Sequence, residues 1–337
     1  MTEKIPYREA ILRQPAVLAA SRAVVRAAVA AIDPAPLCTG RVVLTGIGAS
    51  LYAAQAGAAH LRSGGVRAVA MAAAELCENG LDIADVYVAV SASGRSVEPA
   101  RAMEMRPGAL SYGIAKQAGS PLARVVRGVI PTGSGRDSTP NTTSFTGSLL
   151  ALGYIADRVM GSDDADWEAL PAQLDRLLDD IGDPVARLAA TFRQRAAIDC
   201  VGQGVSYGIA GYAALMLREA ARIPAQSWDT LNFLHGPMEP NGTQTGVLVF
   251  GDGREVKLAE DLAAFGIPTG LITTRGDVRD RVGLVVLRLP SAASGMAGAI
   301  HQAIPAQLIA GALADAAGLP ECVFRYRQSD TKLALAS

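Results

Sequence analysis

The sequence predicts an α/β fold made of two doubly wound parallel-sheet domains in tandem. The chain has 337 residues, half of them apolar, which is more than one hydrophobic core usually supports and enough to fill two. Short apolar runs alternate with longer helical patterns, as is typical of parallel sheets covered by helices on both faces. Residues 43–50 also recur as residues 199–206, at an offset of 156 positions. The repeat indicates that one α/β unit occurs twice.

Each copy of the repeat has the pattern of a short strand, a Gly-x-Gly-x-Ser turn and an Ala-rich helix. The turn occupies residues 46–50 in the first copy and residues 202–206 in the second. The following strand repeats too, because residues 86–90 and residues 247–250 are both apolar and both lead into a Gly-Arg pair. We therefore expect two flavodoxin-like or Rossmann-like domains, whose ligands would lie at the carboxyl ends of the strands.

The repeat and the segments around it divide the chain into four parts. Residues 1–31 are expected to form an N-terminal helical arm, and residues 32–162 a first domain that binds the substrate. Residues 163–195 are polar with spaced leucines, which predicts a helical linker. Residues 196–337 form the second domain, with the candidate catalytic residues and a C-terminal tail.

Composition argues against several classes of partner. The 31 basic and 32 acidic side chains are spread without long runs, so the chain has no electrostatic footprint for nucleic acid or an anionic membrane. Glu3 and Lys4 stand where a secretory signal would be apolar, and no uncharged apolar run reaches the roughly 18 residues of a membrane span. We expect a soluble cytoplasmic protein whose partners are small molecules and other copies of itself.

Cofactor motifs are also missing from the sequence. Gly46-x-Gly48 is followed by Leu51 rather than the third glycine of a dinucleotide fingerprint, which disfavours a nicotinamide cofactor. The three histidines, His60, His235 and His301, lack metal-ligand spacing. No Cys-x-x-Cys pair occurs, and four buried thiols are expected at Cys38, Cys77, Cys200 and Cys322. We therefore expect neither a metal nor an organic cofactor.

Two hydroxyl-rich segments point to a phosphate site. Residues 91–96, Ser-Ala-Ser-Gly-Arg-Ser, lie between a predicted strand and a helix that begins near Val97, where hydroxyls and free backbone N–H groups bind anions. Residues 138–144 form a second cluster before another predicted helix. Either cluster alone is more often an ordinary helix cap. Because the two follow successive strands of one sheet, together they favour a phosphate-binding pocket.

Glu219 is the first candidate catalytic residue. It falls in a predicted helix over residues 207–222, and its neighbours one turn away are Leu215, Met216 and Ile223. These apolar neighbours would desolvate the carboxylate and raise its pKa, which suits a proton carrier that works near neutrality. The alternative is a solvated glutamate paired with Arg222 at i+3. The helix pattern alone leaves both open.

His235 and Lys332 complete the candidate set. His235 stands before Gly236-Pro237, sixteen positions after Glu219, and could be a simple turn residue. A carboxylate and an imidazole can together move protons on carbon and oxygen without a metal, which indicates sugar-phosphate chemistry. The chain uses Arg 27 times and Lys only four times, yet its tail contains Lys332. Lysine can lose its proton and attack a carbonyl, although a frayed, solvated tail is the alternative.

These motifs resemble the sugar isomerase (SIS) domain family over nearly the whole chain, in particular tandem SIS proteins such as the isomerase half of glutamine:fructose-6-phosphate amidotransferase. The most specific match is Leu217-Arg218-Glu219 followed at the family's interval by His235-Gly236-Pro237. Residues 141–146 resemble a run of the galactosamine-6-phosphate deaminase/isomerase branch. The other matching segments are residues 11–15, 48–50, 91–96 and 331–333.

The resemblance implies roles for single residues and a homodimer with shared active sites. Glu219 would transfer a proton between C1 and C2 of the sugar, Lys332 would meet its carbonyl, and His235 would open the ring after reaching into the partner's pocket. The residues expected to bind the substrate are Gly48, Ala49, Ser50, Ser91, Ala92, Ser93, Ser96, Asn141 and Thr142.

Departures from the family pattern narrow the activity. The lysine that the amidotransferase has three residues before its glutamate is Met216 here, the glutamine of its phosphate loop is Ala92, and the acidic residue before the histidine is Asn232. Position 2 is not a cysteine and no glutaminase domain precedes the repeat, so we expect no glutamine hydrolysis within this polypeptide.

Three functions remain open on this evidence. The first is an amino-sugar-phosphate deaminase/isomerase, which Lys332 favours. The second is a deglycase that releases an amino acid from a phosphorylated Amadori compound, which Met216 favours. The third is a non-catalytic phosphosugar-binding regulator, against which the retention of Glu219, His235 and Lys332 argues.

Overall fold

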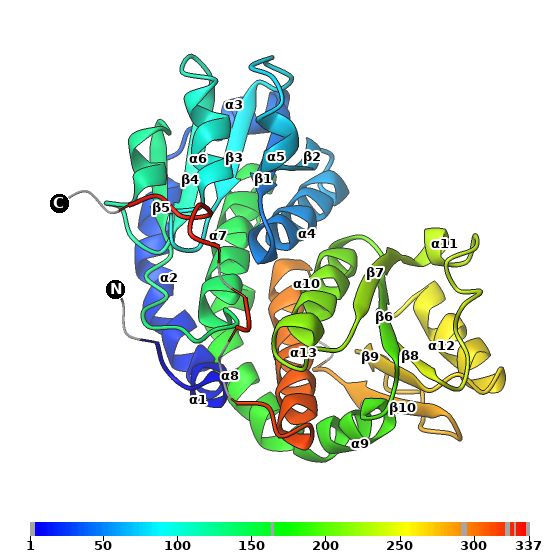
Figure 1. Cartoon of the computed structure of the whole chain (residues 1–337). Coiled ribbons are helices and arrows are strands. Elements are labelled where there is room, and N and C mark those ends of the chain that lie inside the picture. Colours follow the sequence, from blue (N-terminus) through cyan, green and yellow to red (C-terminus); the bar gives the residue numbers. More distant parts are fainter. Residues whose placement is uncertain (1–3, 163–164, 291–294, 321–323, 327, 335–337) are drawn as a thin grey trace.

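Two five-stranded parallel sheets form the framework of the protein (Figure 1). The structure is a computed structural model, and it describes residues 4–162, 165–290, 295–320, 324–326 and 328–334. The first sheet has the strand order β2-β1-β3-β4-β5, and the second has β7-β6-β8-β9-β10. Both are the flavodoxin-like order, with strands running parallel throughout. The predicted class, two parallel α/β domains in tandem, is confirmed.

Secondary structure in the first half surrounds the first sheet. Its strands are β1 (Arg41–Gly46), β2 (Arg67–Ala72), β3 (Val86–Val90), β4 (Leu110–Ala115) and β5 (Gly128–Pro131). The helices are α1 (Tyr7–Leu12), α2 (Gln14–Ala30), α3 (Ala35–Thr39), α4 (Ala49–Ser63), α5 (Ala73–Leu76), α6 (Val97–Glu104), the 3₁₀ turn η1 (Pro121–Arg124) and α7 (Thr143–Met160).

The second half begins with two helices and then repeats the unit. Its helices are α8 (Ala165–Asp180), α9 (Gly182–Phe192), α10 (Val205–Glu219), α11 (Thr230–Phe233), α12 (Arg254–Ala264) and α13 (Gly295–Ala316). Its strands are β6 (Ala197–Gly202), β7 (Ala225–Asp229), β8 (Thr245–Phe250), β9 (Thr269–Thr273) and β10 (Leu284–Arg288). Strand β6 begins and ends 156 residues after strand β1, and helix α10 begins and ends 156 residues after helix α4.

Glycines explain why the repeated turn is tight. Gly48 and Gly204 have φ angles of +56° and +60°, which residues other than glycine rarely adopt. A Cβ atom on Gly46 would lie 2.7 Å from the Ser50 backbone, and one on Gly202 would lie 2.6 Å from the Ser206 backbone. Because these glycines carry no side chain, the helix can begin close to the end of the strand.

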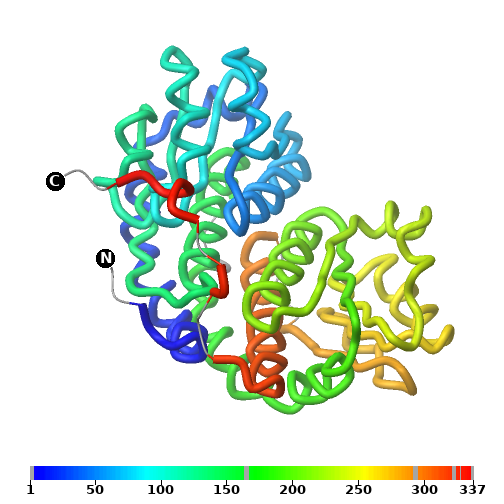
Figure 2. Tube along the Cα trace, in the orientation of Figure 1, coloured from blue at the N-terminus to red at the C-terminus, as the bar shows by residue number. Residues whose placement is uncertain are grey.

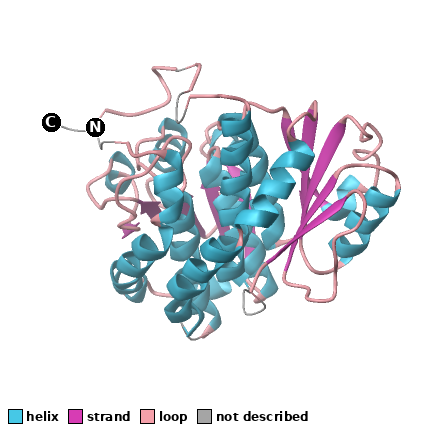
Figure 3. Ribbon diagram, turned by 90° about the horizontal axis from the view of Figure 1, so that it is seen from below, coloured by secondary structure: helices cyan, strands magenta, loops and turns pink. Residues whose placement is uncertain are grey.

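The two sheets are joined through helices, which lie between them in Figure 3. Helices α4 and α10 cross closely because α10 presents glycines at the contact: a Cβ on Gly211 would lie 2.2 Å from the Tyr52 ring. One hydrophobic core runs through this interface and includes Leu152, Tyr212 and Ile304 from α7, α10 and α13. The carboxyl end of α10 is thereby fixed beside the first domain.

A buried hydrogen-bond network also ties the opening helices to this interface. The Gln14 side chain donates to the Gln307 Oε1 at 2.6 Å and accepts from the Thr146 hydroxyl at 2.8 Å. Gln307 in turn donates to the Tyr212 hydroxyl at 3.0 Å, and Tyr212 donates to the Asn141 carbonyl at 2.8 Å. The network therefore ends at one of the predicted substrate-binding residues.

After α13 the chain returns to the first sheet, as Figure 2 shows in red. Residues 331–333 lie along residues 95–97, although they follow the second sheet in the sequence. The Leu333 N–H donates to the Arg95 carbonyl at 2.8 Å, and Ser96 forms a β-bridge with Lys332. The tail therefore contributes to the site of the first domain.

Two sequence-based expectations about surfaces can be compared with this fold. The expectation of buried thiols is wrong for Cys38, which is exposed, and for Cys77, which is half-buried, because both lie at the rim of the first domain. Cys200 is buried as expected, and Cys322 lies outside the described residues. Within the described residues, no helix is both long enough and apolar enough to span a membrane.

Candidate active site

The segment predicted to bind phosphate connects β3 to α6. Ser96 is the N-cap residue of α6 and is 7% exposed, whereas Ser93 is exposed. Ser91 is 1% exposed, and its Oγ accepts from the Ser96 N–H at 3.4 Å. Ser93 and Ser96 both line the cavity described below, and Ser91 supports the loop from within.

Gly94 allows this loop to turn. Its φ is +63°, and a Cβ atom would lie 2.2 Å from the Ser120 side chain. We expect Gly94→Ala to weaken the binding of a phosphate-bearing ligand to this loop by about tenfold or more, because a left-handed alanine costs roughly 1–2 kcal/mol and Ser120 must also move. Isothermal calorimetry measures the affinity. Gly108→Ala is the control, since its Cβ would meet nothing within 4 Å, and an equal effect of both changes would contradict the argument.

The second hydroxyl cluster is held in place by Asp137, which is 3% exposed. Its Oδ1 accepts from the backbone N–H groups of Ser138, Thr142 and Thr143 at 2.8, 3.0 and 3.2 Å, and from the Thr142 hydroxyl at 2.9 Å. Its Oδ2 accepts from the Ser144 N–H at 3.0 Å. Burial opposes ionisation, but hydrogen bonds from Ser144 and Thr142 outweigh it and lower the pKa of Asp137. This carboxylate fixes the start of α7.

The tail places Lys332 against the phosphate loop. Its Nζ donates to the Ser96 Oγ at 2.8 Å, and the Arg95 Nε donates to the Leu333 carbonyl at 2.7 Å. Part of the Lys332 side chain is exposed, but its ammonium end lies in the cavity described below. Burial of that end lowers the pKa of Lys332, Glu98 opposes this, and Arg95 and Lys4 add to it. A lowered pKa increases the fraction of neutral amine.

Glu219 is the last residue of α10 and is half-buried. Burial raises the pKa of its carboxyl to about 7, as expected from its apolar neighbours. Helix α10 ends at Glu219, and Arg222 lies beyond it with φ +58°, so the two residues do not stand on one helix face. Met216 is fully buried in the hydrophobic core and is not among the residues that line the cavity described below.

One cavity of about 420 Å³ brings most of the predicted residues together. The predicted residues that line it are Gly48, Ala49, Ser50, Ala92, Ser93, Ser96, Asn141, Glu219 and Lys332. It lies at the carboxyl ends of the first sheet's strands and is closed by the end of α10 and by the tail (Figure 1). Serine hydroxyls, two lysines and two glutamates in one cavity suit a small polar anion.

Three predicted residues do not line this cavity. Ser91 and Thr142 are buried behind its walls and hydrogen-bond to Ser96 and Asp137. His235 is exposed in the loop after α11, in the second domain. Its backbone N–H donates to the Asn232 carbonyl at 3.0 Å. Within a single chain, Glu219 and His235 therefore do not share a cavity.

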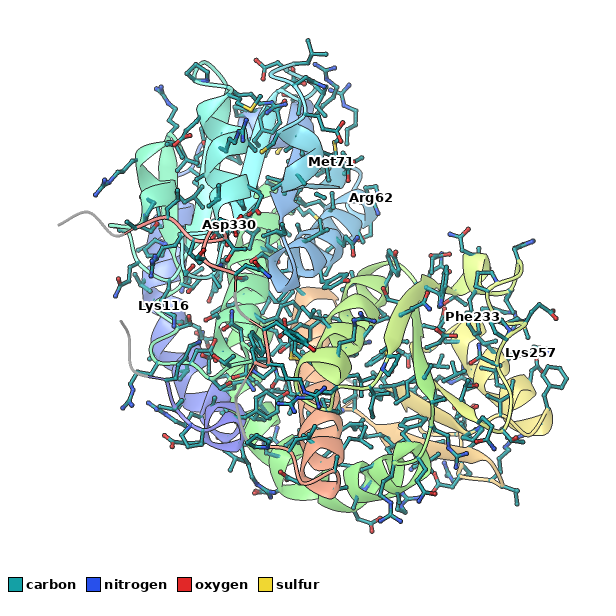
Figure 4. The ribbon with its side chains drawn as sticks, in the orientation of Figure 1. Arg62, Met71, Lys116, Phe233, Lys257 and Asp330 are labelled. Carbon is teal, nitrogen blue, oxygen red and sulfur yellow. The ribbon has the colours of Figure 1, made fainter. Side chains whose placement is uncertain are left out.

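Lys4 is a cavity residue that the sequence reasoning missed. Its Nζ donates to the Ser138 carbonyl at 2.6 Å and to the Asn141 Oδ1 at 3.4 Å. Lys116 follows β4 (Figure 4), and its pKa is lowered by burial, raised by Asp137 and lowered by Lys4. Two of the chain's four lysines, Lys4 and Lys332, line this cavity, and the scarcity of lysine was the available signal.

Comparisons with known proteins agree with this arrangement. No family model matches the chain. It is 28% identical over 294 residues to glutamine–fructose-6-phosphate aminotransferase of Pyrococcus horikoshii, which covers 81% of this chain and 48% of that protein. The chain thus spans about half the length of this curated relative.

Solved structures show the same fold. The C-terminal domain of glucosamine-fructose-6-phosphate aminotransferase from Francisella tularensis superposes with a TM-score of 0.79 at 18% identity, covering 95% of this chain and 98% of that one. Glucosamine-6-phosphate deaminase from Thermotoga maritima gives a TM-score of 0.70 at 17% identity, covering 91% and 95%. The chain is therefore a homologue of the isomerase (SIS) portion of glutamine–fructose-6-phosphate aminotransferase, and it has the fold of tandem SIS proteins.

Proposed function

We propose that the chain is a phosphosugar aldose-ketose isomerase of the deaminase/isomerase type, which acts on an amino-sugar phosphate resembling glucosamine or galactosamine 6-phosphate. One observation carries the proposal: a single cavity contains the phosphate loop, Lys332 and a carboxyl group whose pKa is about 7. A group that titrates near neutrality can both accept and return a proton. The name of the Thermotoga maritima neighbour adds support.

The substrate's phosphate would bind Ser93, Ser96 and the N–H groups at the start of α6. Once the ring is open, Glu219 would remove the proton from C2 and return it to C1. This transfer converts the C2 amine into a C2 imine. Water then adds to the imine and ammonia leaves, which yields the ketose phosphate. Lys332 would hold the carbonyl oxygen, or its neutral amine would form a transient imine at the carbonyl carbon with loss of water.

Ring opening requires His235, which lies outside the cavity of its own chain. We propose a homodimer in which His235 of each chain enters the partner's cavity. The exposure of this side chain and its position on the second domain support the proposal. The partner's imidazole would then donate a proton to the ring oxygen next to Glu219.

Deglycation of a phosphorylated Amadori compound is the second candidate, because Met216 leaves no lysine near Glu219 on α10. Both reactions use the same proton transfer and differ in the amine released. A non-catalytic regulator, the third possibility, would not need a carboxyl group with a raised pKa.

The experiment is ammonia release from 2-amino-2-deoxyhexose 6-phosphates by the wild type, Glu219→Gln and His235→Ala. We expect turnover by the wild type only. Mixing the two inactive variants should then restore about a quarter of the activity, since half of the random dimers are mixed and each has one intact site. If no amino-sugar phosphate releases ammonia, the deaminase proposal is overturned. If mixing the variants restores no activity, the proposal of an active site shared between two chains is overturned.

A further inference from the structure

The N-terminal arm brings Lys4 to the cavity that contains the phosphate loop. Ile5, the next residue, is buried, and its N–H donates to the Asp137 carbonyl at 3.3 Å. Tyr7 is buried as well, and its hydroxyl donates to the Gln307 carbonyl at 3.1 Å. Two anchored residues therefore follow Lys4 closely, and they fix the place where the arm meets the first domain.

The Lys4 ammonium keeps a donor for a ligand. Much of the side chain is exposed, but its Nζ donates to the Ser138 carbonyl at 2.6 Å and to the Asn141 Oδ1 at 3.4 Å. An ammonium group has three N–H donors and accepts no hydrogen bond. Both of these acceptors are uncharged, so they leave the positive charge of Lys4 in place. A third N–H and a full charge remain for an oxygen in the cavity.

The same contact determines which way the Asn141 amide faces. Because an ammonium can only donate, Asn141 must turn its Oδ1 toward Lys4, which leaves the two N–H donors of Nδ2. In the described part of the chain, no residue accepts from this Nδ2. The Tyr212 hydroxyl holds the Asn141 backbone by donating to its carbonyl at 2.8 Å. Lys4 and Asn141, which both line the cavity, therefore offer it donors.

Carboxyl groups line the cavity from other elements. Glu98 belongs to α6 and Glu219 to α10, whereas Lys4 and Asn141 come from the arm and from the loop before α7. An ammonium group has no lone pair and repels Lys4, so it suits the carboxyl groups. A hydroxyl oxygen has lone pairs and can accept from Lys4 and Asn141 together. An amino sugar carries both kinds of group.

We propose that Lys4 and Asn141 form a subsite for one sugar oxygen, the hydroxyl on C1, C3 or C4, and that this subsite rejects an ammonium group at the same position. The proposal rests on the proposed function for the class of substrate, a hexosamine 6-phosphate. It makes Lys4 a specificity-determining residue. The phosphate stays on the loop of Ser93 and Ser96.

Calorimetric binding of matched ligands tests the subsite. The titrations use the Glu219→Gln chain, which should bind the substrate without consuming it. Glucosamine 6-phosphate is compared with its 1-, 3- and 4-deoxy derivatives. One of the three should bind at least about tenfold more weakly than the parent compound, because it lacks the oxygen that accepts from a charged donor.

The variant Lys4→Met identifies the partner of that oxygen. Added to the Glu219→Gln chain, it should weaken the parent compound by about tenfold and change the affinity of the identified deoxy derivative by no more than about twofold. Lys257→Met removes an exposed lysine from α12 in the second domain (Figure 4) and is the matched control. It should leave the affinities of all these ligands unchanged.

A change at Asn141 tests the donor character of the subsite. A derivative with an amine in place of the identified hydroxyl should bind even more weakly than the deoxy derivative, since its ammonium meets only donors. Asn141→Asp replaces the amide by a carboxylate, which accepts, so this derivative should then bind more tightly than the deoxy one. An unchanged order of the two ligands would contradict the donor-only subsite.

The outcomes separate the subsite from the proposed function. If Lys4→Met weakens the parent and all three deoxy derivatives equally, Lys4 contacts the phosphate or supports the fold, and the sugar-oxygen subsite alone is overturned. The same holds if Lys4→Met changes no affinity. A loss confined to ligands that carry one particular oxygen supports the subsite, even if the wild type releases no ammonia and only the deaminase proposal fails. If none of these ligands binds, both proposals are overturned.

Discussion

Glu219→Gln is expected to reduce phosphosugar turnover by roughly 10²–10⁴-fold, the usual contribution of a positioned general base. Glutamine has nearly the same shape and keeps the cavity wall, so the affinity for the substrate should change little. Steady-state kinetics with calorimetric binding measures both quantities. Glu104→Gln makes the same chemical change on an exposed residue at the end of α6 and should leave turnover unchanged. A Glu219→Gln variant with nearly full activity would contradict the assignment.

The raised pKa of Glu219 also predicts how activity depends on pH. The base form is the ionised one, so kcat/KM should fall as the pH drops below about 7. The pH profile of the wild type measures this limb. An acid limb near the ordinary carboxyl value of 4.5 would show that burial does not shift this group in solution.

The free energy of unfolding should fall as the pH rises, whereas kcat/KM should increase. The folded-state pKa of Glu219, about 7, is above the ordinary 4.5, so between these values the folded state binds more protons than the unfolded state. The free energy of unfolding therefore falls as the pH rises through this window. Glu219→Gln removes the effect, so its stability relative to the wild type should increase from pH 4.5 to 7 and then level off. Urea titrations at several pH values test this.

Asp137→Ala is expected to have the largest effect on stability, on the order of 3–5 kcal/mol. The buried carboxylate accepts five hydrogen bonds from residues 138–144, and its removal leaves four backbone N–H groups and a hydroxyl without their acceptor. Asp137→Asn should cost less, because its amide oxygen can still accept the four bonds made to Oδ1. Urea denaturation gives both values.

The lowered pKa of Asp137 sets the pH dependence of this effect. A depressed folded-state pKa stabilises the fold above the unfolded value, about 3.9, and this stabilisation is lost as the pH falls through the folded-state pKa. The difference between the wild type and Asp137→Asn should therefore narrow in acid. Asp175→Asn, an exposed position on α8, is the control and should stay within about 0.5 kcal/mol. Equal losses of unfolding free energy in Asp137→Asn and Asp175→Asn would contradict the stabilising role of the Asp137 carboxylate.

The sequence by itself determined the repeated α/β unit and the loop between β3 and α6, and it left two environments open for Glu219. These features depend on neighbours along the chain. Strand and helix periodicity, the glycines at 46 and 48, and the apolar residues one turn from Glu219 all act within a few positions of one another. Because both copies share these local signals, the same strand order forms twice.

Only the tertiary structure decided which distant segments meet at the site. Lys332 reaches Ser96 across 236 positions, Lys4 reaches Ser138 across 134, and neither pairing leaves a periodic pattern. Likewise, Thr142 turns toward Asp137 instead of the cavity, although its hydroxyl resembled a ligand in the sequence. The physical reason is that side-chain direction and cavity shape depend on how packed helices cross, and local sequence patterns do not show these long-range contacts.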